Sequence, residues 1–163
     1  MNIAVIGTGY VGLVTGACFS EFGVHVTCVD NDEEKIKALN RGQIPIYEAG
    51  LEELVARNVK GGRLQFTSDA EAAIDQALVV FIAVGTPEAP DGSTDLRYIE
   101  AVAREIGQRM TSYKVIVAKS TVPVGTSDRV RVCIDEELAR RGKNISYSLA
   151  SNPEFLREGA AIG

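Results

Sequence analysis

Two glutamates in the last segment of the sequence are spaced so that they could share a binding site. In SNPEFLREGAAIG, Glu154 and Glu158 are four residues apart, and Arg157 lies between them. A helical turn would place both carboxylates on one face, and a strand that ends just before Asn152 would aim them into a ligand crevice. The residues alone favour a plainer interpretation, a solvated charged turn, because most charged turns lie on the surface.

A glycine-rich turn near the N-terminus has the spacing that binds a pyrophosphate. NIAVIGTGYVGLVTG holds Gly7, Gly9 and Gly12 as G-x-G-x-x-G between a predicted strand and a predicted helix. The first glycine permits a tight turn, the second lets the backbone approach a pyrophosphate, and the third lets the helix pack close to the sheet. Free N–H groups around Tyr10 and Val11 would then face the phosphates at the positive end of the helix dipole. The alternative is that these glycines serve only the turn and the packing.

An acidic residue, Asp30, closes the next predicted strand 18 positions after Gly12. Its carboxylate can accept hydrogen bonds from an adenosine ribose, and its charge would repel a 2′-phosphate, so the pattern favours NAD over NADP. A solvated acid at a strand end is the alternative. Lys35 follows on the first turn of the next helix, where a solvated lysine is the default interpretation.

These residues need a scaffold of alternating strands and helices. Short apolar runs alternate with amphipathic stretches, and Gly, Asp, Ser or Asn separate them. The near-continuous apolar character of ALVVFIAV suits a parallel sheet covered on both faces. We therefore predict an α/β fold, a doubly wound parallel six-stranded Rossmann sheet with helices on both faces, in one domain over residues 1–163. The predicted strands are residues 2–6, 24–30, 64–67, 78–84, 114–119 and 145–150.

Apolar stripes at helical spacing predict three longer helices. The first stripe is Val11, Val14, Cys18 and Phe22, with Gly23 at the C-terminal cap. The second is Ile99, Val102, Ala103, Ile106 and Met110. The third is Val130, Ile134 and Leu138, in a helix predicted over residues 126–141 and ended by Gly142. Asp32 and Ser68 are predicted N-caps of shorter helices. The loops GTPEAPDGSTD and STVPVGT each follow the carboxyl end of a strand, the edge at which open α/β sheets bind ligands.

Composition argues against several classes of partner. The formal net charge is −5, the sequence pI is about 5.0, and there is no dense Lys or Arg block, so we expect neither nucleic acid nor an anionic membrane as a partner. The longest apolar run, residues 77–84, is far shorter than the roughly 20 residues of a membrane span. No signal peptide pattern is visible, which predicts a cytoplasmic protein.

The cysteines and the histidine offer little for metal or nucleophilic chemistry. Cys18, Cys28 and Cys133 show no CxxC spacing, and His25 is the one histidine, so we expect neither a disulfide framework nor a metal site. A reactive thiolate needs an exposed, electropositive setting. These three cysteines fall within a predicted helix stripe, a strand and a long helix, and we expect them to act as small apolar side chains.

Six motifs in order carry a resemblance that covers essentially the whole chain. They are GTGYVG, VDNDEEKI, PIYEAGLEEL, FIAVGTP, KSTVPVGT and NPEFLREG. In this order they resemble the N-terminal NAD-binding domain of the UDP-glucose 6-dehydrogenase family, within the wider group of nucleotide-sugar 6-dehydrogenases. The resemblance implies oxidation of the C6 alcohol of UDP-glucose to a carboxylate, with two hydrides passed in turn to two NAD molecules through a thioester on a cysteine. GDP-mannose and UDP-N-acetylmannosamine are the alternative substrates.

The resemblance also implies which residues bind the cofactor. Tyr10 and Val11 would lie on the NAD pyrophosphate, Asp30 on the ribose, and Lys35 near the same adenosine end. Thr86 of the GTP motif would line the cofactor cleft.

For the reaction itself, the resemblance implies three catalytic residues. Thr121 would stand near the nicotinamide and the reacting C6, where it would position water or a glutamate. Glu154 would act as a general acid and base on the thioester and on the water that hydrolyses it. Glu158 would contact both the cofactor and the sugar. Phe155, Leu156 and Arg157 would contact the substrate. Without the resemblance, Thr121 is better interpreted as a turn residue ahead of Pro123.

The chain departs from the family pattern at two points. Ala49 stands where the family usually has proline in YEPGL, within a connecting loop. The family's catalytic cysteine and its UDP-binding domain lie downstream of the part that this chain matches. We therefore expect this chain by itself to bind NAD without turning over UDP-glucose. The resemblance also implies that the intact protein is a homo-oligomer.

Two other classes of protein could share the cofactor motifs. A non-catalytic NAD-binding regulatory module would explain the glycine turn and Asp30 equally well, but gives no reason for Thr121, Glu154 and Glu158 at strand ends. A methyltransferase that binds an adenosyl sulfonium could use the acid, but has no need for a pyrophosphate turn.

Overall fold

The computed structural model describes residues 1–162, in which the strands form a parallel six-stranded sheet. The strand order is β3-β2-β1-β4-β5-β6, as in doubly wound dinucleotide-binding folds. The predicted fold class is confirmed, and each predicted strand is present with ends that differ by two residues or fewer. The strands are β1 (Asn2–Ile6), β2 (His25–Val29), β3 (Leu64–Thr67), β4 (Val79–Ile82), β5 (Lys114–Ala118) and β6 (Tyr147–Ser151).

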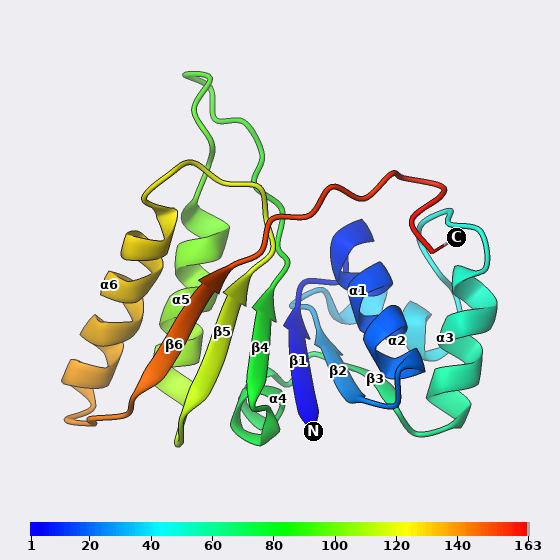
Figure 1. Cartoon of the computed structure of the whole chain (residues 1–163), viewed down its shortest axis with the longest axis horizontal. Coiled ribbons are helices and arrows are strands. Elements are labelled where there is room, and N and C mark those ends of the chain that lie inside the picture. Colours follow the sequence, from blue (N-terminus) through cyan, green and yellow to red (C-terminus); the bar gives the residue numbers. More distant parts are fainter. Residues whose placement is uncertain (163) are drawn as a thin grey trace.

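Helices cover both faces of the sheet (Figure 1). One face carries α1 (Tyr10–Glu21), α2 (Glu33–Asn40) and α3 (Leu51–Lys60), and the other carries α4 (Ala70–Gln76), α5 (Arg97–Arg109) and α6 (Thr126–Arg140). The side chains of β1 point alternately to the two faces of the sheet. Ile3 and Val5 join one buried cluster, and Ala4 and Ile6 join the other. Burial on both faces fixes the register of the strands.

The predicted stripe of the first helix is wrong in part. Phe22 is 82% exposed, because α1 ends at Glu21 and Phe22 belongs to the turn that Gly23 closes at φ +86. Only Val14 of the predicted stripe is fully buried, and Val11 and Cys18 are half-buried. Helix α1 contacts both the sheet and α3, so its small residues are buried on more than one side and no single stripe describes it.

The other predicted helices agree better with the structure. The predicted stripes of α5 and α6 are buried, and Asp32 is the N-cap of α2. Ser68 is not an N-cap: Asp69 caps α4, and its side chain accepts a hydrogen bond from the N–H of Ala72. Helix α3, which begins within the PIYEAGLEEL motif, was not predicted as a separate helix.

The winding of the sheet reverses between β1 and β4, which are neighbours in it. The helix after β1 covers one face and the helix after β4 covers the other, so the loops that follow these two strands diverge at their carboxyl ends. Such a divergence leaves a crevice for ligands in open α/β sheets.

After β6, the chain runs across the carboxyl edge of the sheet toward α1 and α3 (Figure 1). The N–H of Asn152 donates to the carbonyl of Ala118 at 2.9 Å, which holds the start of this segment. The side chain of Leu156 packs against the cluster under α1, so the middle of the segment is also fixed.

The helical turn predicted for Glu154 to Glu158 is wrong, because residues 152–157 form no helix. The Leu156 N–H donates to Glu154 Oε2 at 2.6 Å. The N–H groups of Gly159, Ala161 and Ile162 donate to the side chain of Glu48. Donors that a helix would need are therefore satisfied by side chains, which compete with helical hydrogen bonding.

Candidate functional site

The turn between β1 and α1 requires glycine at two of its three predicted positions. Gly7 has φ +107, a conformation that favours glycine, and its N–H donates to the carbonyl of Val29 at 2.7 Å. A Cβ on Gly12 would lie 1.9 Å from the carbonyl oxygen of Gly7. The tight turn and the close approach of the helix are the roles predicted for these two residues.

Gly9 differs from both, because nothing in the protein requires a glycine there. Its φ of −73° and ψ of −168° are accessible to any residue, and a Cβ would meet no atom within 4 Å. Gly9 is the N-cap of α1 and precedes N–H groups that have no partner within the helix. The open space therefore fits a diphosphate approaching the main chain at the positive end of the helix.

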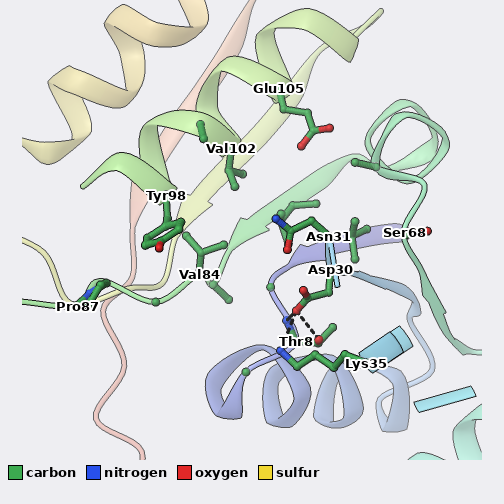
Figure 2. A pocket seen from close by; sticks show the side chains of 18 residues that line it. Thr8, Asp30, Asn31, Lys35, Ser68, Val84, Pro87, Tyr98, Val102 and Glu105 are labelled. Atoms are coloured by element: carbon green, nitrogen blue, oxygen red, sulfur yellow. Dashed lines mark hydrogen bonds and ion pairs between the residues drawn. The ribbon is translucent and has the colours of Figure 1, made fainter. Parts of the chain in front are cut away.

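Asp30 lies just past the end of β2 and is held by several donors (Figure 2). Its Oδ2 accepts hydrogen bonds from the N–H of Thr8 at 3.0 Å, from the hydroxyl of Thr8 at 2.6 Å and from Lys35 Nζ at 3.0 Å. Its Oδ1 accepts the N–H of Asp32 at 3.1 Å. Partial burial acts to raise the pKa of Asp30, but these hydrogen bonds outweigh it, so the pKa is lowered and the carboxylate stays ionised.

A cavity of about 460 Å³ lies between Asp30 and helix α5. Figure 2 shows Asp30 and Lys35 at one side, with Tyr98 and Val102 of α5 facing the cavity from the other. Apolar walls with an ionised carboxylate at the edge suit a flat heteroaromatic ring that carries a sugar. The glycine turn lines the same cavity, so one ligand can reach both Gly9 and Asp30.

A second cavity, of about 240 Å³, shares Gly9 with the first and extends toward β5. It brings together three residues that the resemblance implied, Thr86, Thr121 and Glu154, and Tyr10 and Val11 also line it. The hydroxyl of Thr86 donates to the carbonyl of Thr121 at 3.3 Å, which joins the loops after β4 and β5.

The remaining predicted substrate residues do not line either cavity. Phe155 is 93% exposed, and Arg157 and Glu158 are also exposed. The side chain of Leu156 is half-buried and packs against the core, so a ligand would meet mainly its main chain. The structure thus groups Glu154 with Thr121 but leaves Glu158 outside that group.

Two further polar residues, Thr8 and Glu48, were not predicted from the sequence. Thr8 is fully buried and orients Asp30 through both its N–H and its hydroxyl. It stands between two turn glycines and could have been noticed as a hydroxyl facing the predicted acid. Glu48 is a buried carboxylate in the loop before α3, and only its place within a recognised motif pointed to it.

The cysteines lie away from both cavities. Cys28 and Cys133 are buried and Cys18 is half-buried, and all three thiols are free. Burial raises the pKa of each thiol, and that of Cys28 rises to about 12. Cys28 and Cys133 belong to the buried apolar clusters and Cys18 packs against one, so each fills apolar space as expected, and the raised pKa values are opposite to those of a nucleophile. Among residues 1–162, no helix combines the length and apolar character needed to cross a bilayer.

A doubly wound parallel sheet, an open main-chain approach at Gly9 and an acid at the end of β2 define a dinucleotide-binding domain. A comparison with protein families identifies it further. The chain belongs to the UDP-glucose/GDP-mannose dehydrogenase family, whose NAD binding domain matches residues 1–163. The predicted family and the predicted cofactor are therefore confirmed.

Curated proteins and solved structures of this family resemble the chain closely. It is 55% identical to a UDP-glucose 6-dehydrogenase of Rhizobium meliloti, over 99% of this chain and 36% of that protein. A UDP-glucose dehydrogenase structure from Pyrobaculum islandicum superposes with a TM-score of 0.92 at 44% identity, over 99% of this chain and 37% of the other. A GDP-mannose dehydrogenase from Pseudomonas aeruginosa gives 0.90 at 40% identity, over 99% and 38%. The chain thus spans little more than a third of the length of these relatives.

Proposed function

We propose that this chain is the NAD-binding part of an enzyme that oxidises a nucleotide sugar at C6, with UDP-glucose as the preferred substrate. Family membership and the names of its relatives support this reaction class. The UDP-glucose relatives are more similar in sequence than the GDP-mannose relative, which supports the choice of sugar nucleotide. In this proposal residues 1–163 form one folding unit, and the sugar nucleotide is bound mainly by a further part of the protein.

The observation that carries cofactor binding is the open space at Gly9. The diphosphate would accept hydrogen bonds from the N–H groups of Tyr10 and Val11. The adenosine would occupy the larger cavity, with its ribose on Asp30 and with Lys35 beside that carboxylate. The ionised state of Asp30 supports NAD over NADP, since a 2′-phosphate would be repelled.

The smaller cavity is the proposed place of the reacting sugar carbon. NAD supplies a hydride acceptor there when it is bound. Glu154 would take and return protons, and its contact with the Leu156 N–H would hold the carboxylate toward Thr121. Thr121 would position water or the glutamate. Glu158, Phe155, Leu156 and Arg157 would contact the sugar nucleotide from the edge of the cavity, and the nucleophilic cysteine would lie outside this chain.

Two broader properties belong to the same proposal. Free thiols at Cys18, Cys28 and Cys133 are typical of a reducing compartment and support a cytoplasmic location. We also propose that the protein acts as a homo-oligomer, as the family resemblance implies.

The direct test measures NAD binding and NADH formation by the full-length protein. Calorimetry should give saturable binding of NAD, with NADP and S-adenosylmethionine at least about tenfold weaker. Formation of NADH should be fastest with UDP-glucose, compared with GDP-mannose and UDP-N-acetylmannosamine. No saturation at millimolar NAD would contradict the cofactor assignment. Tight NAD binding without NADH formation from any of the three sugars would support the regulatory module instead.

Asp30→Asn should weaken NAD binding by about tenfold, because the ribose hydroxyls lose a charged acceptor. It should also reduce the preference for NAD over NADP, since the repelling charge is gone. In the unchanged protein the affinity for NAD should stay level from about pH 8 to pH 5, because the lowered pKa of Asp30 keeps its carboxylate ionised over that range.

Titration calorimetry at several pH values measures both effects. Glu33→Gln is the matched control, because Glu33 is exposed on the neighbouring α2 and its change removes the same charge. Equal NAD affinity for Asp30→Asn and Glu33→Gln would remove Asp30 from the cofactor site.

A further inference from the structure

Glu48 is a buried carboxylate outside both cavities. It lies in the loop between α2 and α3, is 5% exposed, and belongs to the PIYEAGLEEL motif, which the proposed function leaves without a role. Within the part of the chain that the structure describes, no lysine or arginine pairs with it. A buried charge without a cation needs hydrogen-bond donors to compensate for its lost hydration.

Four donors surround this carboxylate. Its Oε2 accepts the hydroxyl of Tyr10 at 2.5 Å and the N–H of Gly159 at 2.8 Å. Its Oε1 accepts the N–H of Ala161 at 2.7 Å and the N–H of Ile162 at 3.3 Å. The hydroxyl of Tyr10 and then the three main-chain donors lower the pKa of Glu48 despite its burial, so it is a stable anion in the fold.

These contacts join three parts of the sequence that are far apart. Tyr10 is the first residue of α1, directly after the glycine turn, and lines the smaller cavity. Gly159, Ala161 and Ile162 belong to the segment that leaves β6 and carries Glu154. The hydroxyl of Tyr10 also accepts the Gly159 N–H at 3.2 Å, so helix and segment touch directly as well as through Glu48.

The path of this segment depends on anchors at its two ends and on the packing of Leu156 in its middle. Between residues 152 and 162 it has no helix or strand of its own. At its start, Asn152 is held by the carbonyl of Ala118 at 2.9 Å and by Lys119 Nζ at 3.1 Å. At its end, Glu48 takes three main-chain donors. Glu154 lies between the first anchor and Leu156, so loss of the Glu48 contacts leaves the stretch after Glu154 held mainly by the packing of the Leu156 side chain and lets the Glu154 carboxylate move relative to Thr121.

We propose that Glu48 is a positioning residue, which ties the 152–162 segment to the first residue of α1 and thereby places Glu154 beside Thr121. The catalytic role of this placement rests on the proposed function. The contacts by which Glu48 joins the segment to α1 do not depend on it. A carboxylate suits the task because it only accepts hydrogen bonds and its two oxygens together offer about four acceptor sites. Glutamine has one such oxygen, and its NH₂ group would face two donors.

The test compares Glu48→Gln with the control Glu52→Gln in the protein of natural length. Glu52 is exposed on the first turn of α3, four residues from Glu48, so the same change there removes no contact to the segment. Hydrogen exchange should quicken by at least about tenfold at the amides of Gly159, Ala161 and Ile162 in Glu48→Gln, with the amides of β1 and β4 unchanged. Glu52→Gln should exchange like the unchanged protein at all these sites.

Steady-state kinetics separate positioning from general stability. For Glu48→Gln we expect kcat/KM for the sugar nucleotide to fall by about tenfold or more while KM for NAD stays within about twofold. A merely structural role would lower only the fraction of competent protein, so kcat/KM per NAD-binding site, with the sites counted by calorimetry on the same preparation, would be unchanged; a positioning role lowers kcat/KM per site. Faster exchange across the whole sheet, unchanged exchange at the three amides, or local exchange with unchanged kcat/KM would each overturn the proposal.

Tyr10→Phe provides a second variant in case Glu48→Gln does not fold. It removes one of the four donors and should quicken exchange at the same three amides by a smaller factor, because the main-chain donors keep Glu48 in place. Unchanged exchange in Tyr10→Phe would overturn the tie between α1 and the segment. If the unchanged protein forms no NADH, the proposed function fails, but the exchange results still decide whether Glu48 holds the segment.

Discussion

Gly9→Ala is expected to weaken NAD binding by about 100-fold while the protein stays folded. A methyl group at Gly9 would point into space that is open in the protein, at the place where the diphosphate would approach the main chain. Loss of one hydrogen bond to a charged group costs about 1.5–3 kcal/mol, which corresponds to roughly 10- to 150-fold in affinity. The backbone angles at Gly9 are ordinary, so the free energy of unfolding should change by less than about 1 kcal/mol.

Titration calorimetry and urea denaturation on the same preparation measure the two quantities separately. A glycine kept only for the turn would give the opposite pattern, with lower stability and an affinity that is unchanged in the folded fraction. Gly9→Ala with normal NAD affinity would therefore place the diphosphate elsewhere.

Gly12→Ala is expected to destabilise the fold by about 3 kcal/mol or more, since overpacking of this kind has no cheap relaxation. Its Cβ would lie 1.9 Å from the carbonyl oxygen of Gly7, and the backbone of both residues is held in place by β1 and α1. To relieve the clash, α1 would have to move away from the sheet. That movement would also disturb the N–H groups at the start of α1.

Urea denaturation followed by circular dichroism measures this loss. Gly9→Ala is the matched comparison, because it adds the same methyl group to the same turn where the space is open. An unfolding midpoint for Gly12→Ala equal to that of the unchanged protein would show that α1 does not depend on its close packing against Gly7.

The cofactor half of the site was predictable because it is local in sequence. Gly7, Gly9 and Gly12 occur within six residues, and Asp30 follows at the end of the next strand. Each depends on a geometry that β1, α1 and β2 impose regardless of the rest of the chain. The apolar strand runs determined the fold class for the same reason, since burial on both faces of a parallel sheet leaves a signal in every strand.

The substrate half was less predictable because its backbone is held by residues distant in sequence. The spacing of Glu154 and Glu158 suggested a helical turn, but Glu48 takes main-chain donors from residues more than a hundred positions away. A local pattern carries no trace of such a partner. Phe22 illustrates the same limit at the end of α1, where apolar spacing continued for one residue after the helix had ended.

The most direct measurement is a crystal structure of this protein with NAD bound. Its diphosphate should lie within hydrogen-bond distance of the N–H groups of Tyr10 and Val11, with a hydroxyl of the adenosine ribose on the carboxylate of Asp30. A dinucleotide lodged at another face of the sheet, or one whose diphosphate does not meet the start of α1, would contradict the assignment on which the proposed chemistry depends.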